Sequence, residues 1–272
     1  MAACTSARTC RAPRWVLIAS RSRMRGPEAG NAARLARELP SPVAPHPLDA
    51  RITADRARKY RQVLARRTSR LAVVIEDSYD QHNATAILRT CDAMGIHRVV
   101  VTTARNAFQV NDKVSQGVHR YLDLHVLPDI DAAAALLKSM GYKLWVTDLA
   151  ADAAIGPQTL LPRLQQDPIA IVFGNEGSGI TPRARELADG CFLLPMSGFS
   201  QSLNLSVSAA MTLQALRGAA VAADDAGDLP PGEQQVVYDR WVRRYLGEEI
   251  GGPLPTPAQD RRGVQVDSYR AC

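Results

Sequence analysis

Polar side chains gather at one joint in the chain, between a short apolar run at 191–194 and a run of small and apolar residues that begins at Leu205. The joint contains four uncharged hydrogen-bonding residues: Ser200, Gln201, Ser202 and Asn204. Some of them would cap a helix that starts at Leu205, because the first N–H groups of a helix lack partners. Four such residues exceed what one cap needs. The joint is therefore either a well-capped loop or a loop that binds a ligand.

A second polar cluster, at 80–92, contains Asn83 and Arg89. We expect Asn83 to be the N-cap of a helix, with Arg89 six residues later among apolar neighbours. An arginine in such surroundings must find acceptors. Arg89 is therefore either paired with a carboxylate such as Asp92 or free to hold an anion, and the residues alone do not choose between these roles.

A third cluster, FGNEGSGI at 173–180, places three glycines and Glu176 directly after an apolar strand. It contains neither GxxxxGK[ST] nor GxGxxG, so we exclude a phosphate-binding loop and a nicotinamide dehydrogenase. The glycines predict a place where the backbone passes close to a flat or bulky ligand. The carboxylate of Glu176 would then face that ligand.

The elements that position these clusters alternate between strand and helix, with short connections. Strands are predicted at 71–76, 97–102, 121–127, 144–148, 169–173 and 191–194, and helices at 53–67, 83–94, 129–140, 181–187 and from 205 onward. This alternation predicts an α/β fold with a mostly parallel sheet flanked by helices. In such sheets ligands bind beyond the carboxyl ends of the strands, where all three clusters fall.

Composition bounds the class of protein. The chain has 272 residues, of which 46% are hydrophobic, and no apolar run approaches the roughly 20 residues that span a bilayer. We therefore expect a soluble protein that does not enter a membrane. Five cysteines form no CxxC pair, and no histidine lies at zinc-ligand spacing, so a disulfide framework and a structural metal are not expected. A reducing cytosol or organelle matrix fits this cysteine usage.

Positive charge is concentrated near the N-terminus. Residues 1–70 hold 16 of the 33 Lys and Arg residues against four acids, which gives a charge of +12. The rest of the chain carries −6, so the net charge of the whole chain is +6. Residues 1–24 lack acids and have either the composition of an organellar transit peptide or that of an overlong start, with Met24 as an alternative start. The proline-rich segment 40–47 is interpreted as a linker. The basic helix at 53–67 is either an RNA-binding helix or a solvated surface helix.

Taken together, the motifs NATAILR (83–89), FGNEGSG (173–179) and LPMxGxxQSLNLS (194–206) resemble the three motifs of the SpoU branch of the SPOUT RNA 2′-O-methyltransferases. The resemblance covers about residues 52–246. It implies a SPOUT-type fold with a C-terminal trefoil knot, a homodimer, and S-adenosyl-L-methionine as cofactor. By the same resemblance, the cofactor-binding residues are Thr147, Gly174, Leu194, Met196 and Leu203.

The resemblance also assigns the catalytic residues: Arg89, Asn83, Glu176, Ser202 and Asn204. Arg89 is the residue implicated in activating the ribose hydroxyl. A guanidinium almost never gives up its proton, so we expect Arg89 to clamp an RNA phosphate and orient the ribose. Asn83 would position Arg89, Glu176 would order the site, and Ser202 and Asn204 would shape the loop at the ribose.

Flanking features resemble the TrmH subfamily, which methylates the guanosine at position 18 of tRNA. They include KYRQVLARR (59–67), SQGVHRYL (115–122) and the C-terminal VYDRWVRRYL (237–246). The resemblance implies that the basic helix and Arg240, Arg243 and Arg244 grip tRNA, and that the protein is cytoplasmic and bacterial. Two alternatives stay open: a sister SpoU enzyme acting on rRNA or another tRNA position, and an RNA-binding protein without catalysis.

Five regions follow from these interpretations. They are a basic, disordered extension at 1–50, an RNA-binding helix at 51–70, a SPOUT methyltransferase domain at 71–220, a linker and C-terminal helix at 221–250, and a tail at 251–272.

Overall fold

The computed structural model describes residues 38–150, 152–220 and 226–248. The predicted tail at 251–272 and most of the predicted extension lie outside these residues, as does Met24. The described chain contains a seven-stranded sheet in the order β3-β2-β1-β6-β4-β7-β5. All of its strand pairs are parallel, which confirms the predicted α/β architecture.

The strands follow the predicted apolar runs closely. They are β1 (Thr68–Glu76), β2 (Ile96–Thr102), β3 (Asp123–Leu127), β4 (Lys143–Thr147), β5 (Ala154–Ile155), β6 (Ile169–Phe173) and β7 (Gly190–Leu193). The two-residue strand β5 is too short to leave a periodic pattern, and it was not predicted. Strand β1 begins three residues before the expected Leu71 and pairs with β2 on one side and β6 on the other.

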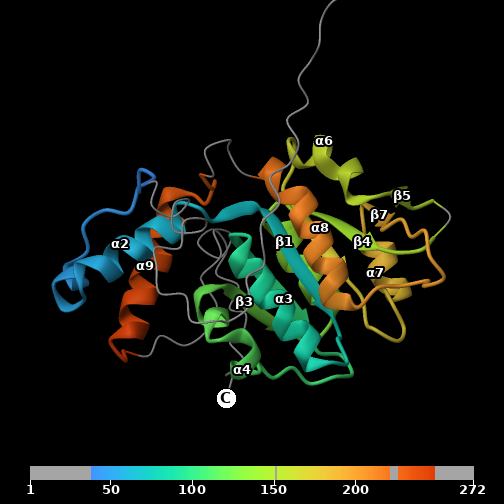
Figure 1. Cartoon of the computed structure of the whole chain (residues 1–272), viewed down its shortest axis with the longest axis horizontal. Helices are drawn as coiled ribbons and strands as arrows, with labels where there is room; N and C mark the ends of the chain where they lie inside the picture. Colours follow the sequence, from blue (N-terminus) through green and yellow to red (C-terminus); the bar gives the residue numbers. More distant parts are fainter. Residues whose placement is uncertain (1–37, 151, 221–225, 249–272) are drawn as a thin grey trace, which may run out of the picture. The chain divides into compact units, whose positions relative to one another are not determined.

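Helices cover both faces of the sheet because side chains alternate along each buried strand. On one face, Leu71, Val73 and Ile75 of β1 pack with α3 (Gln81–Ala93), α8 (Leu205–Ala220), η3 (Pro157–Leu160) and α6 (Leu161–Leu164). On the other face, Ala72 and Val74 pack with α5 (Ile130–Ser139) and α7 (Pro182–Leu187). Helices α3 and α8 run side by side across the sheet (Figure 1).

A separate apolar core joins α2 (Ala54–Leu64) to α9 (Pro231–Tyr245), which lie together in Figure 1. Tyr60 of α2 makes an edge-to-face contact with Trp241 of α9, with ring centroids 5.5 Å apart. The segment before α2 also packs here through the buried Val43 and the short helix η1 (Pro47–Arg51). Residues 39–50, placed in the N-terminal extension by sequence, thus contribute to this core.

The connection from β2 to β3 carries two short helices, α4 (Asp112–Ser115) and η2 (Val118–Tyr121), that pack beside α3. Neither was predicted, because one turn of helix has no amphipathic pattern. None of the described helices is long and apolar enough to cross a membrane. Among the described residues, no group of three or more His, Cys, Asp and Glu side chains could hold a metal ion.

Not every basic residue of the predicted RNA-binding helix at 53–67 is exposed. Arg67 is fully buried, and its guanidinium donates to Asp92 Oδ1 at 2.5 Å and to the carbonyl of Ile96 at 3.3 Å. It follows α2 at the entry to β1, so its side chain turns toward the sheet. Asp92 is thereby bound to Arg67 and does not serve as the acceptor for Arg89.

We predict that Arg67→Met lowers the free energy of unfolding by about 2 to 3 kcal/mol, because the buried carbonyls and Asp92 lose their donor. Asp92 is 28% exposed, so water can solvate it, which keeps the loss at the lower end of the range for broken buried pairs. Urea unfolding measures the change. The matched control Lys59→Met, at an exposed position of α2, should alter stability by less than about 0.5 kcal/mol. Equal stability of the two variants would contradict the role of Arg67.

Candidate functional site

The carboxylate of Glu176 connects three segments at the carboxyl edge of the sheet. Its Oε1 accepts hydrogen bonds from Ser78 Oγ at 2.7 Å and from Asn83 Nδ2 at 3.1 Å. Its Oε2 accepts from the backbone N–H of Tyr79 at 2.9 Å. Glu176 follows β6, whereas its partners follow β1 or lie in α3. One side chain therefore fixes the loops after two neighbouring strands.

Asn83 extends this contact to the beginning of α8. Asn204 Nδ2 donates to Asn83 Oδ1 at 2.9 Å, while Asn204 Oδ1 accepts from the backbone N–H of Ser206 at 2.9 Å. Asn204 thus caps α8, as one reading of the joint predicted. Glu176, Asn83 and Asn204 form a continuous row of hydrogen-bonded side chains, which we name the polar chain. Each of its members comes from a different one of the three sequence motifs.

Hydrogen bonding keeps Glu176 ionised. Partial burial raises the pKa of this carboxyl, but hydrogen bonds from Ser78, Asn83 and the Tyr79 N–H favour the charged form and bring the pKa below its ordinary value of 4.5. A carboxylate with three donors can only accept, so Asn83 must present its amide N–H₂ to Glu176 and its oxygen to Asn204. The charge of Glu176 therefore sets the orientation of the neighbouring amide.

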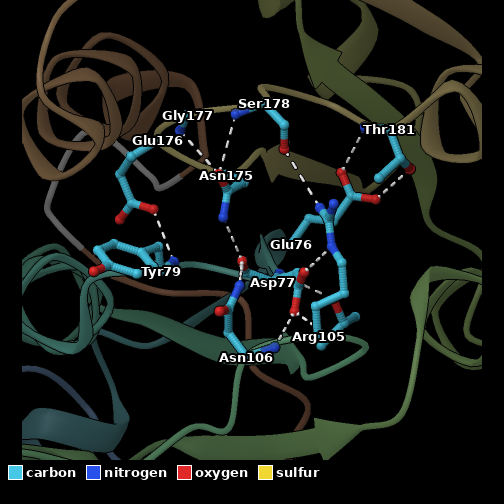
Figure 2. A network of polar contacts seen from close by, with 11 residues as sticks. Glu76, Asp77, Tyr79, Arg105, Asn106, Asn175, Glu176, Gly177, Ser178 and Thr181 are labelled. Carbon is cyan, nitrogen blue, oxygen red and sulfur yellow. Dashed lines mark hydrogen bonds and ion pairs between the residues drawn. The ribbon is translucent and has the colours of Figure 1, made fainter.

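The loop that leaves β1 is fixed by a second network, shown in Figure 2. Asp77 is buried and has φ of 50°, a left-handed conformation that Asp tolerates better than most residues. Its carboxylate accepts from the backbone N–H groups of Arg105 and Asn106, each at 2.8 Å, and from Arg105 Nε at 2.8 Å. Although burial raises the pKa of Asp77, these donors lower it below the ordinary value.

The same network reaches the glycine-rich loop after β6. Asn175 Nδ2 donates to the carbonyl of Asp77 at 2.8 Å, and Asn175 Oδ1 accepts from the N–H groups of Gly177 and Ser178. Figure 2 shows Asn175 between the two loops, with Glu176 directed to the opposite side from Arg105. Asn175 therefore fixes the turn that presents Glu176 to its three donors.

Arg89 lies on α3, the helix that carries Asn83, but its side chain is exposed. It makes no hydrogen bond or ion pair with any residue in the described part of the chain. Because Asp92 is bound to Arg67, the structure removes the proposed Arg89–Asp92 pair and leaves the guanidinium available for an anion. Ser202 is also exposed, in the loop before α8.

One local expectation is corrected. The N-cap of α3 is Asp80, whose side chain accepts from the His82 N–H at 2.8 Å, and Asn83 lies inside the helix, where its side chain is free to join the polar chain. Gly174 is small for an internal reason: a Cβ there would lie 2.4 Å from the backbone carbon of Gly179. Gly174 therefore allows the two ends of the glycine-rich loop to pass close to each other.

The predicted cofactor residues lie at the ends of three strands. Thr147 ends β4 and donates through Oγ1 to the carbonyl of Val172 at 3.3 Å, and Gly174 follows β6. Leu194, Met196 and Leu203 belong to the loop between β7 and α8; the first two are partly buried and Leu203 is 38% exposed. The backbone N–H groups of residues 196–203 donate to no described residue. Apolar side chains beside free backbone donors fit an adenosine-containing ligand.

Sequence reasoning did not assign roles to Asp77, Ser78, Tyr79, Asn175 or Arg105. Asp77 and Ser78 could have been found by their position, because they directly follow a buried strand at the ligand-binding edge. Asn175 carried a local signal as well, since Asn followed by glycine favours a turn closed by the Asn side chain. The pairing of Arg105 with Asp77 depends on tertiary structure and leaves no local pattern.

An open parallel sheet with a polar site beyond its carboxyl ends defines an α/β protein that binds its ligand at that edge. The chain belongs to the SpoU rRNA Methylase family, whose pattern matches residues 70–214. The matched range contains the whole polar chain together with Arg89.

Relatives and solved structures of this family extend the match. The chain is 34% identical over 194 residues to tRNA (guanosine(18)-2′-O)-methyltransferase of Thermus thermophilus, covering 71% of this chain and 98% of the relative. It is 37% identical over 145 residues to 23S rRNA (guanosine-2′-O-)-methyltransferase RlmB of Nitrosomonas europaea, covering 53% and 54%. The crystal structure of the TrmH/SpoU tRNA modifying enzyme of Aquifex aeolicus superposes with a TM-score of 0.62 at 26% identity, covering 71% and 97%.

We predict that Glu176→Gln destabilises the chain at neutral pH and much less in acid. Because the folded pKa of Glu176 is lowered, its hydrogen bonds stabilise the fold above the ordinary value of 4.5, and this stability is lost as pH falls through the lowered pKa. Urea unfolding of both proteins at pH 7 and below pH 4.5 tests this. A stability difference that stays constant between the two pH values would refute the assignment.

Proposed function

We propose that this chain is an S-adenosylmethionine-dependent methyltransferase that methylates the ribose 2′-hydroxyl of the guanosine at position 18 of tRNA. The observation that carries this proposal is the polar chain, whose Asn83 lies on α3, together with the free guanidinium of Arg89 on the same helix. The Thermus thermophilus relative, named for this reaction and covered over 98% of its length, supports the choice of substrate.

Bound S-adenosylmethionine would supply a methyl group carried on a sulfonium. Leu194, Met196, Leu203 and the free N–H groups of their loop would hold it, with Thr147 and Gly174 at the neighbouring strand ends. In this role the loop supplies backbone donors and apolar contacts, which suit an adenine ring and an aliphatic sulfonium. Ser202 would contact the ribose from the same loop.

Arg89 would bind an RNA phosphate and orient the ribose hydroxyl toward the methyl group. Since a guanidinium keeps its proton, the proton transfer from the hydroxyl would be completed either by a phosphate oxygen or by deprotonation late in the transition state. The polar chain does not move protons in this scheme. Glu176 and Asn83 hold α3, and thereby Arg89, against the loop that ends at Asn204.

We further propose that the segment following β7 forms the trefoil knot of the SPOUT enzymes and that the enzyme is a homodimer in the cytoplasm. Support for a second copy comes from α8, which leaves Val207 44% exposed and Met211 51% exposed one helical turn apart. This pair of apolar residues lies on the helix that packs against α3.

One observation supports the alternative that the substrate is rRNA. The relative from Nitrosomonas europaea, which matches at 37% identity, is named for 23S rRNA. A methylation assay that offers whole tRNA and ribosomal RNA separately, followed by nucleoside mass spectrometry, distinguishes the two substrates. Methylation of rRNA alone would refute the tRNA proposal. An absence of methyl transfer to either RNA would refute both.

Arg89→Ala should lower kcat/KM for methyl transfer by roughly 100-fold or more, because one charge-stabilising donor is lost in the transition state. The melting temperature should not change, since the side chain is exposed and has no partner in the described chain. Arg89→Lys should recover part of the activity, as a point charge without the planar fork. The control Arg183→Ala, at an exposed position on α7, should leave the rate unchanged. Near-normal transfer by Arg89→Ala would contradict the mechanism.

Of the basic residues expected to grip tRNA, Arg58, Lys59 and Arg244 are exposed. Arg240 is only partly exposed, and burial lowers its pKa; Arg243 is also partly exposed and pairs with Asp239 at 2.9 Å. We therefore assign the RNA contact to the exposed three.

Affinity for tRNA should fall steeply with rising salt, because each contacted phosphate releases a counterion. Lys59→Ala and Arg244→Ala should each reduce the slope of log affinity against log salt by about 1. Fluorescence anisotropy with labelled tRNA over a salt series measures both slopes. A flat dependence for the unsubstituted protein would count against this surface.

A further inference from the structure

Tyr79 presents an aromatic ring to solvent within the site. It lies in the four-residue loop between β1 and α3, and its side chain is 77% exposed. The ring makes no hydrogen bond or aromatic contact with other described residues. Single exposed apolar residues are common on protein surfaces, so exposure alone does not indicate a ligand. What distinguishes Tyr79 is how its backbone is held and what surrounds it.

The backbone that carries the ring is fixed at Tyr79 and at the two residues before it. The Tyr79 N–H donates to Glu176 Oε2 at 2.9 Å, and the preceding Ser78 Oγ donates to Glu176 Oε1 at 2.7 Å. Asp77, one residue earlier, is held by Arg105, Asn106 and Asn175. Rotation is thus confined to the side chain itself, so that little conformational entropy is lost when a ligand covers the ring.

The ring lies beside the residues that the proposed reaction uses. Glu176 accepts hydrogen bonds from both the Tyr79 N–H and Asn83 of α3. The residue that carries the ring is therefore bonded directly to the polar chain. Figure 2 shows the ring extending away from Asp77 and Arg105, past Glu176. Arg89 lies eight residues beyond the first residue of α3, about 12 Å along the helix at 1.5 Å per residue.

The surroundings of the ring favour a nucleobase over a protein surface. Its neighbours in sequence, Ser78, Asp80, Gln81 and His82, are all polar. An apolar protein contact needs several apolar residues together, as Val207 and Met211 offer on α8. A base instead stacks its flat face on one aromatic ring while its polar edge meets hydrogen-bonding groups.

We propose that Tyr79 is a stacking platform for an unpaired nucleobase of the RNA substrate, next to the ribose that is methylated. This inference rests on the proposed function and names the part of the RNA that this edge of the site recognises. The base is taken from a splayed, single-stranded region, because a base within a duplex offers no free face.

The test compares Tyr79→Phe, Tyr79→Leu and Tyr79→Ala. Tyr79→Phe retains the flat ring and should leave KM for RNA within about twofold. Tyr79→Leu keeps an apolar side chain without a π face, so it and Tyr79→Ala should raise KM by about 10-fold, within the range expected for one lost stack. The affinity for S-adenosylmethionine, measured by calorimetry, should not change. Val126→Ala, at another exposed apolar position, is the control.

Two outcomes overturn the inference while leaving the proposed function intact. If Tyr79→Leu matches Tyr79→Phe, stacking is not what the ring contributes. If Tyr79→Leu or Tyr79→Ala changes the sedimentation coefficient of the RNA-free protein, the ring contacts a second copy of the chain. If the unsubstituted protein transfers no methyl group to any RNA and binds none by anisotropy, the proposed function fails and the inference fails with it.

Discussion

The ionised carboxylate of Glu176 is the constraint on which the site depends. It accepts three hydrogen bonds from residues that belong to the loop after β1 and to α3. The contact is possible because β1 and β6 are paired in parallel through Ile75 and Phe173, so that both chains leave the sheet at one edge. Hydrogen bonds to a charged group contribute more than neutral ones, about 1.5 to 3 kcal/mol each. A single side chain thus determines the relative position of two loops and one helix.

This arrangement separates the residues that hold the site from Arg89, the residue that we propose to act in it. The side-chain amides of Asn83 and Asn204 make their hydrogen bonds within the protein. These two residues therefore act as rigid supports. Arg89 keeps its donors for the substrate, because Asp92, the nearby carboxylate, is bound to the buried Arg67.

The strands were predictable because buried parallel strands appear as continuous apolar runs, as at 71–76 and 169–173. Local sequence patterns gave wrong predictions where tertiary contacts decide the position of a side chain. Arg67 resembled the exposed Arg58 of the same segment, yet it turns inward at the start of β1. Asn83 suited a cap, but Asp80 three residues earlier took that place and freed Asn83. The Asp77–Arg105 pair joins residues 28 positions apart and leaves no local signature.

The core shared by α2 and α9 has a consequence for how the chain assembles during synthesis. Asp49 and Tyr238, which share a hydrogen bond in this core, lie 189 positions apart. Helix α2 therefore emerges from the ribosome long before the helix that buries Tyr60 and Leu64. The parallel sheet can form in the interval, since its strands precede α9 in the chain. The surface that we assign to tRNA is thus completed last, after the site that performs the chemistry.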